Sequence, residues 1–118
     1  MNCNVVETKS FEFAVRIVNL HNYLKSKKKE FTLAKQILRS GTSIGANIAE
    51  AQQAQSKADF IAKMSIALKE TAETKYWLRL LLATEYLESK EFQSILFDCL
   101  ELERLLVSIL KTCRQEEK

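Results

Sequence analysis

The chain has 118 residues, of which 47% are hydrophobic and 28% charged, so it can build one core and is too apolar for an intrinsically disordered protein. It contains no proline and two glycines, whereas β-sandwiches and barrels use both residue types in their many turns. The net charge of +3 is below the excess expected of a dedicated DNA-binding domain. We therefore expect a single all-α domain over residues 1–118.

Four amphipathic segments follow one another along the chain. The predicted helices span about residues 10–26, 32–54, 57–84 and 90–113. Ser10 and Ser56 are the expected N-caps of the first and third helices, and Asp59 completes a variant of the capping box after Ser56. Because the connections are short, consecutive helices should be antiparallel, which predicts an up-down-up-down four-helix bundle.

The apolar surfaces of the first, third and fourth helices are wider than a bundle core needs. In the first helix, the hydrophobic residues between Phe11 and Leu20 cover roughly 220° of the circumference, against about 100° for an ordinary core-facing stripe. One side of each arc can fill the core, and the other side would be exposed unless a partner covers it. We expect that partner to be another copy of the chain, with a different protein as the alternative.

The second helix also has a face of small residues. Ala34, Leu38, Gly41, Gly45 and Ala49 fall close together at helical spacing. Each glycine inside a helix costs about 1 kcal/mol relative to alanine, so a close contact or a kink should compensate for it. Either a neighbouring helix approaches closely here, or the helix breaks around residues 40–43.

Polar residues form one row on the second helix and another on the third. These residues are Arg39, Ser43, Asn47 and Glu50, and Glu70, Glu73, Thr74 and Trp77. If the rows face inward, their groups must pair, because unpaired buried charges are costly. We interpret them as a structural network that fixes helix register, with a solvated face or a ligand site as the alternatives.

Catalytic and metal-binding patterns do not emerge from the sequence. Di-iron bundles need Glu-x-x-His pairs on two helices, yet His21 is the one histidine and no glutamate stands three residues before it. The cysteines Cys3, Cys99 and Cys113 are odd in number and widely spaced, which favours free thiols in a reducing cytoplasm. Phosphate-binding glycine loops, a secretion signal and a membrane span are not recognisable. We expect a cytoplasmic protein without catalytic residues, bound metal or cofactor.

Basic residues concentrate in the first half of the chain. Residues 1–57 hold nine basic and four acidic residues, whereas residues 58–118 hold nine and eleven. The lysines Lys25, Lys27, Lys28 and Lys29 mark the first connection, and Lys35 follows in the second helix. The run is either a solvated loop or a surface that contacts phosphates without sequence specificity.

Several segments resemble the signature of one bacterial family. The stretch RSGTSIGANIAEA at residues 39–51, the pair at 59–60, IALKE at 66–70, the pair at 73–74 and the three residues at 76–78 carry the resemblance. The family comprises four-helix-bundle proteins encoded in intervening sequences of 23S ribosomal RNA genes, also labelled S23. The resemblance extends over about residues 11–113, although Gly45 stands where many members have proline and Ala51 where many have glycine.

The resemblance implies an antiparallel four-helix bundle that assembles into a ring-like homopentamer. The family is similar in architecture to the accessory protein of diversity-generating retroelements, which engages a reverse transcriptase and nucleic acid. It therefore implies association with RNA or a nucleic-acid-processing protein, and it assigns Ser43, Asn47, Glu50, Glu70, Glu73 and Trp77 to the core or to a subunit interface. We expect a non-enzymatic homo-oligomer that binds RNA through the lysine run, with a protein-only scaffold as the alternative.

Overall fold

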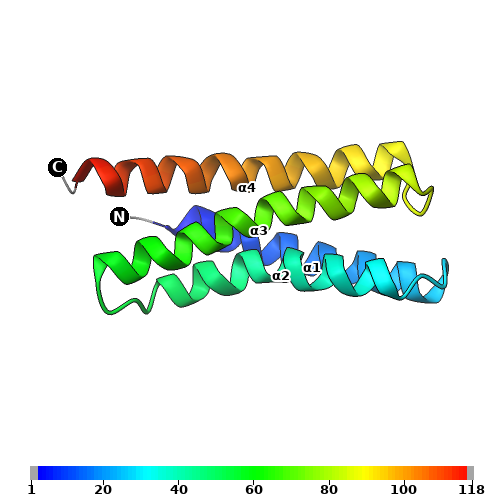
Figure 1. Ribbon diagram of the computed structural model, residues 1–118, viewed down its shortest axis with the longest axis horizontal. Helices are drawn as coiled ribbons and strands as arrows, with labels where there is room; N and C mark the ends of the chain where they lie inside the picture. Colours follow the sequence, from blue (N-terminus) through cyan, green and yellow to red (C-terminus); the bar gives the residue numbers. More distant parts are fainter. Residues whose placement is uncertain (1–2, 117–118) are drawn as a thin grey trace.

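The computed structural model describes residues 3–116, and this part of the chain consists of four helices without a β-strand. The helices are α1 (Asn4–Ser26), α2 (Thr32–Ala51), α3 (Lys57–Ala83) and α4 (Ser89–Glu116). The bundle measures 49 × 22 × 19 Å. The α1–α2 and α3–α4 connections lie at one end of the long axis and the α2–α3 connection at the other (Figure 1). The expected all-α class with four helices is confirmed.

Helix α1 begins earlier than the sequence pattern predicts, at Asn4 instead of about residue 10. Ser10 is therefore not an N-cap: it is buried within the helix, and its hydroxyl donates to the Glu7 carbonyl at 3.0 Å. Val6 is 1% exposed, so the added first turns bury apolar surface of their own. That burial explains why the helix extends beyond the serine that resembles a cap.

Side chains accept backbone N–H groups at the N-termini of α3 and α2, but from different positions. Ser56 accepts a hydrogen bond from the Asp59 backbone N–H at 3.0 Å, which confirms the predicted cap of α3. Helix α2 has no side-chain bond from its N-cap residue Phe31. Instead, the Glu30 carboxylate accepts the N–H groups of Leu33 and Ala34 at 2.6 and 3.1 Å. Glu30 thus places its charge against the positive end of the α2 dipole.

The core lies between α1–α2 and α3–α4, where α1 contacts α2 and α4 and α3 contacts the same two helices. Each helix contributes residues at spacings of three and four, and most of these are below 2% exposed. Representative members are Ile17 and Leu24 of α1, Ile44 and Ile48 of α2, Leu78 and Leu81 of α3, and Leu102 and Leu106 of α4. Since the backbones of α1 and α3 are not adjacent, the two helices occupy opposite corners of the bundle.

The glycines of α2 allow α1 to approach closely, and α2 runs unbroken through residues 40–45. A Cβ atom on Gly41 would lie 2.8 Å from Cγ1 of Ile17, and one on Gly45 would lie 3.1 Å from the Ser10 carbonyl oxygen. The alternative of a helix break around residues 40–43 is therefore wrong, and the close contact accounts for the glycines.

We predict that Gly41→Ala destabilises the protein although alanine is the better helix former. Alanine should gain about 1 kcal/mol of helix propensity, but overpacking against fully buried Ile17 should cost about 1–3 kcal/mol. Urea denaturation measures the net change in the free energy of unfolding. Ala46→Gly on the exposed face of α2 is the control, with an expected loss of about 1 kcal/mol. A Gly41→Ala protein more stable than the parent would contradict the close-packing explanation.

Candidate functional site

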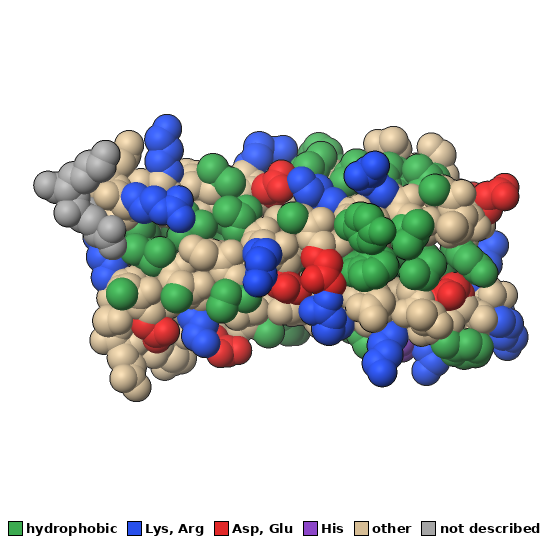
Figure 2. Space-filling model, viewed as in Figure 1, with side chains coloured by type: hydrophobic (Ala, Val, Ile, Leu, Met, Phe, Trp, Pro, Cys, Tyr) green, Lys and Arg blue, Asp and Glu red, His purple; other side chains and the backbone are tan. Residues whose placement is uncertain are grey.

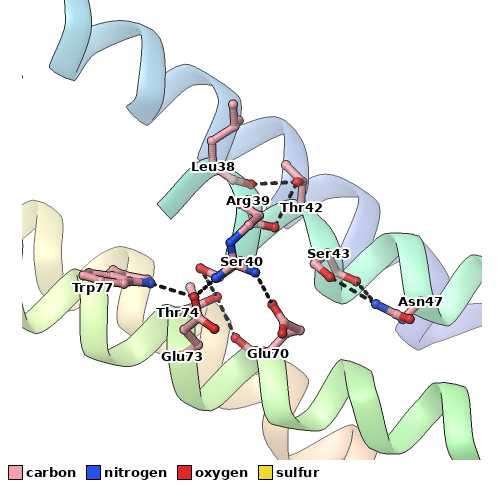
Figure 3. A network of polar contacts seen from close by, with 10 residues as sticks. All are labelled: Leu38, Arg39, Ser40, Thr42, Ser43, Asn47, Glu70, Glu73, Thr74 and Trp77. Atoms are coloured by element: carbon pink, nitrogen blue, oxygen red, sulfur yellow. Dashed lines mark hydrogen bonds and ion pairs between the residues drawn. The ribbon is translucent and has the colours of Figure 1, made fainter. Parts of the chain in front are cut away.

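A polar network joins the facing sides of α2 and α3 near their middles (Figure 3). The Arg39 guanidinium forms ion pairs with Glu70 Oε2 at 3.5 Å and with Glu73 Oε2. The Trp77 indole N–H donates to the same Glu73 oxygen at 2.9 Å. Four of the residues singled out from the sequence thus meet in one place, with Arg39 as the cation between two carboxylates.

Glu70 is the most deeply buried charge of this network. It is 7% exposed, and its Oε2 atom accepts no hydrogen bond within the described residues. The Arg39 ion pair is therefore its main electrostatic compensation, because an isolated carboxylate in a low-dielectric environment carries a large desolvation penalty. Arg39 itself is exposed, so the network reaches from the core to the surface.

Two hydroxyl groups continue the network into the core. Thr74 Oγ1 lies 3.1 Å from Ser40 Oγ and 2.8 Å from the Glu70 carbonyl oxygen, and both side chains are fully buried. Ser40 was not singled out from the sequence. Its position directly after Arg39, on the buried side of α2, is the signal that could have identified it. Satisfied buried hydroxyls favour one helix register over others.

The remaining polar residues of α2 lie outside this network. Asn47 donates from Nδ2 to the Ser43 carbonyl at 2.9 Å and to the Ser43 hydroxyl at 3.1 Å, so this pair is local to α2. Glu50 is exposed and pairs with Lys63 at 3.4 Å. The row of four residues on α2 therefore divides, and Arg39 alone of them contacts the carboxylates of α3.

We predict that Arg39→Met lowers the free energy of unfolding by about 2 kcal/mol, because it leaves the Glu70 carboxylate buried without its cation. Glu70→Gln added to Arg39→Met should recover part of the loss, since the stranded charge is removed. Chemical denaturation of the single and double variants measures both effects. The matched control is Lys63→Met, whose partner Glu50 is exposed and which should cost below about 0.5 kcal/mol. Equal losses for the two single variants would rule out a special role for the buried carboxylate.

The lysine run forms a basic end of the bundle, which we define as Lys25, Lys27, Lys28, Lys29 and Lys35. All of these side chains are exposed, and within residues 3–116 none of them forms an ion pair with an acidic side chain. The neighbouring carboxylate of Glu30 is engaged at the N-terminus of α2. The basic end therefore presents positive charge without a local counter-ion of its own.

A second group of cations lies along α3 and α4. A simple charge count does not reveal them, because acidic residues outnumber basic residues in that half of the sequence. Lys69, Arg79, Arg104 and Lys111 are exposed and form no ion pair within the described part of the chain. Charge counting along the sequence misses them because nearby carboxylates point elsewhere: Asp98 and Glu101 pair with α1, and Glu103 pairs with Lys75. On α3, positions 69, 72, 76 and 79 follow one another at spacings of three and four, which places Lys69 and Arg79 on one face of the helix. This periodicity is the signal that could have revealed these two cations.

The three cysteines, Cys3, Cys99 and Cys113, are buried. Burial raises the pKa of the Cys99 thiol from 9.0 to about 12, and burial also raises the pKa of Cys3. A thiol that stays protonated at neutral pH is a poor nucleophile. His21 Nδ1 lies 3.2 Å from Asn22 Oδ1. Within residues 3–116, no group of three or more His, Cys, Asp or Glu side chains is placed to hold a metal ion.

We predict that Cys99 makes the protein less stable as the pH rises from about 9 to about 12. In this range the unfolded chain releases the thiol proton whereas the folded protein keeps it, so its stabilising contribution is present below pH 9 and is lost above it. The slope should approach about 1.4 kcal/mol per pH unit. Denaturation of the parent and of Cys99→Ala at several pH values measures the difference in slope. Identical slopes would contradict the burial of an un-ionised thiol.

None of the helices in the described part of the chain combines the length and hydropathy needed to cross a membrane.

Comparison with known proteins places this bundle among related structures. The family model described as 23S rRNA-intervening sequence protein matches residues 3–108. A crystal structure from Bacteroides thetaiotaomicron VPI-5482, of a protein with unknown function from the S23 ribosomal protein family, is 61% identical in sequence with a TM-score of 0.89. The match covers 90% of this chain and 98% of that one. Among curated proteins, no significant match was found.

Proposed function

This chain belongs to the 23S rRNA-intervening sequence protein family, and on that premise we propose that it is a non-enzymatic, cytoplasmic homo-oligomer that associates electrostatically with RNA. In this proposal the fold is an antiparallel up-down-up-down bundle, and several bundles form a ring-like homopentamer. The pentameric number rests on the family resemblance alone.

The basic end is the observation that carries the RNA proposal. Five exposed lysines lie within eleven residues of sequence, and the described residues supply no ion pair to any of them. Lys29 adopts φ 55° in the short connection between α1 and α2, which lies at one end of the bundle (Figure 1). Unpaired lysines at one end suit the phosphate backbone, whose contacts depend on charge more than on base sequence.

Exposed apolar side chains support the homo-oligomer. Phe11 is 71% exposed, and Val15, Tyr76 and Val107 are also exposed. Large apolar patches on a soluble chain are typical of interaction surfaces, and closed symmetric homo-oligomers are the commonest assemblies. Repetition of the basic end in each copy would turn weak phosphate contacts into a multivalent surface.

We predict that replacing Lys25, Lys27, Lys28 and Lys29 with Gln weakens RNA binding at least tenfold at low salt and reduces the slope of log affinity against log salt concentration. The reason is that each lost phosphate contact releases fewer counter-ions on binding. Fluorescence anisotropy with a labelled single-stranded RNA gives the affinities. Light scattering in the same buffers verifies that the oligomeric state is unchanged.

The matched control removes the same number of positive charges elsewhere. Lys9, Lys57, Lys63 and Arg114 lie outside the basic end, and the first three pair with exposed or half-exposed carboxylates. Their replacement by Gln should leave RNA affinity within about twofold. Equal weakening by both variants would show that net charge, and not this end of the bundle, drives binding. Absence of RNA binding by the parent protein at low salt would overturn the RNA proposal and favour a protein-only scaffold.

A further inference from the structure

Helix α1 carries an exposed apolar ridge formed by Phe11, Val15 and Val18. Their side chains are 71%, 47% and 40% exposed, and their spacing of four and three residues places them on one face of the helix. This face lies opposite the buried residues Phe13, Ile17 and Leu20 of the same helix. The ridge therefore contributes nothing to the core of its own bundle.

A long, shallow and open groove lies between α3 and α4. It consists of two adjoining hollows of about 850 and 680 Å³, and Ala72 lines both of them. Apolar side chains line most of the larger hollow, among them Tyr76, Leu80, Leu96 and Leu100, whereas in the smaller hollow Leu68, Ala72 and Val107 lie among charged and polar side chains. On α3 it extends from residue 68 to residue 83, a rise of about 22 Å, whereas the ridge on α1 spans only about 10 Å. In Figure 2, hydrophobic side chains along α3 and α4 are flanked by Lys and Arg side chains.

The charges beside the ridge and the groove are opposite in sign. Lys69, Arg79, Arg104 and Lys111 line the groove without an ion pair among the described residues, and the groove's one carboxylate, Glu103, is paired with Lys75. The ridge is flanked by Glu7 and Glu12, for which the described residues provide no ion pair. Lys25, an unpaired cation on the same face, lies two helical turns beyond Val18. The cations of the same part of α1, Lys9 and Arg16, turn towards α4 and pair with Glu101, Glu91 and Asp98.

We propose that the α1 ridge of one copy docks into the α3–α4 groove of a second copy. The shape is that of an amphipathic helix in an apolar groove, with anchors at positions i, i+4 and i+7. Burial of the ridge removes apolar area from water, and the acidic flanks of α1 meet the cations of the groove. This inference rests on the homo-oligomer part of the proposed function and names the surfaces that form it.

The contact is head-to-tail, because the ridge and the groove lie on different sides of the copy and cannot both face the same neighbour. Helices α1 and α3 occupy opposite corners of the bundle, so a copy with an occupied groove still offers a free ridge on another side. A heterologous contact of this kind repeats until a ring closes.

Two surface variants test the pairing. The ridge-blocked variant is Phe11→Lys with Val15→Lys, which places ammonium groups against the cations of the groove. The groove-blocked variant is Tyr76→Lys with Val107→Lys, which puts charges where the apolar ridge should lie. All four positions are exposed in the single bundle, so both variants should keep the parent's circular dichroism spectrum. Light scattering coupled to gel filtration should show each variant alone at the mass of one chain.

An equimolar mixture of the two variants gives the decisive result. Each ridge-blocked copy retains an intact groove and each groove-blocked copy an intact ridge, so the mixture should form a dimer of twice the chain mass and nothing larger. Phe97→Lys is the matched control, because Phe97 is an exposed aromatic residue of α4 that does not line the groove. The control should keep the parent's oligomeric mass.

Three outcomes overturn the inference. An unchanged oligomer in either blocked variant would show that the copies associate through other surfaces while the homo-oligomer stands. Monomeric variants that fail to dimerise when mixed would exclude a head-to-tail contact between ridge and groove. A parent protein that is monomeric at every concentration would remove the homo-oligomer itself, and the RNA titration above still decides the RNA proposal separately.

Discussion

The close approach of α1 to α2 fixes how α1 is rotated about its own axis. Gly41 leaves no side chain where Ile17 packs, so α1 seats Ile17 against the backbone of α2. That seating turns Phe13 and Leu20 into the core and leaves Phe11, Val15 and Val18 pointing outwards. A wide apolar arc is thereby divided into a buried stripe and an exposed ridge. The missing Cβ atom of Gly41 thus sets the surface that the bundle presents to a partner.

Within residues 3–116, most acidic side chains form an ion pair or a hydrogen bond, whereas many basic side chains form no ion pair. Glu30 accepts hydrogen bonds at the N-terminus of α2. Glu70 and Glu73 form ion pairs with Arg39, and Asp98 forms one with Arg16. Each paired carboxylate cancels the cation that it pairs with, so the local field is set by the charges that remain unpaired. A net charge of +3 therefore coexists with two groups of uncompensated cations. One group forms the basic end and the other lines the groove between α3 and α4.

The helices and their class could be predicted from the sequence, because periodic apolar residues and a serine cap are local signals. Ser56 shows this well, since its cap depends only on Asp59 three residues later. The start of α1 could not be predicted in the same way. Ser10 resembles a cap in isolation, yet burial of Val6 in the assembled bundle continues the helix to Asn4. Tertiary burial outweighed the local signal there.

The candidate site was partly predictable for the same reason. Helical periodicity correctly places Arg39 of α2 on one face, and Glu70, Glu73 and Trp77 of α3 on another. It cannot say that Ser43 and Asn47 bond to each other within α2, because that choice depends on the rotation of α2 against α3. The groove was missed because it exists only between two helices.

The basic end and the lateral surfaces point in different directions, and this separation joins the two proposals. The basic end lies at the connection between α1 and α2, at one end of the bundle (Figure 1). The ridge on α1 and the groove between α3 and α4 run along the lengths of their helices. Copies that associate side by side in a ring are related by rotation, so every basic end falls on the same rim of the assembly. In the proposed ring, the lysines of the α1–α2 connection would then stay clear of the subunit contacts. Weak phosphate contacts from each copy would add along one strand of RNA, so that a modest charge per chain would give useful affinity.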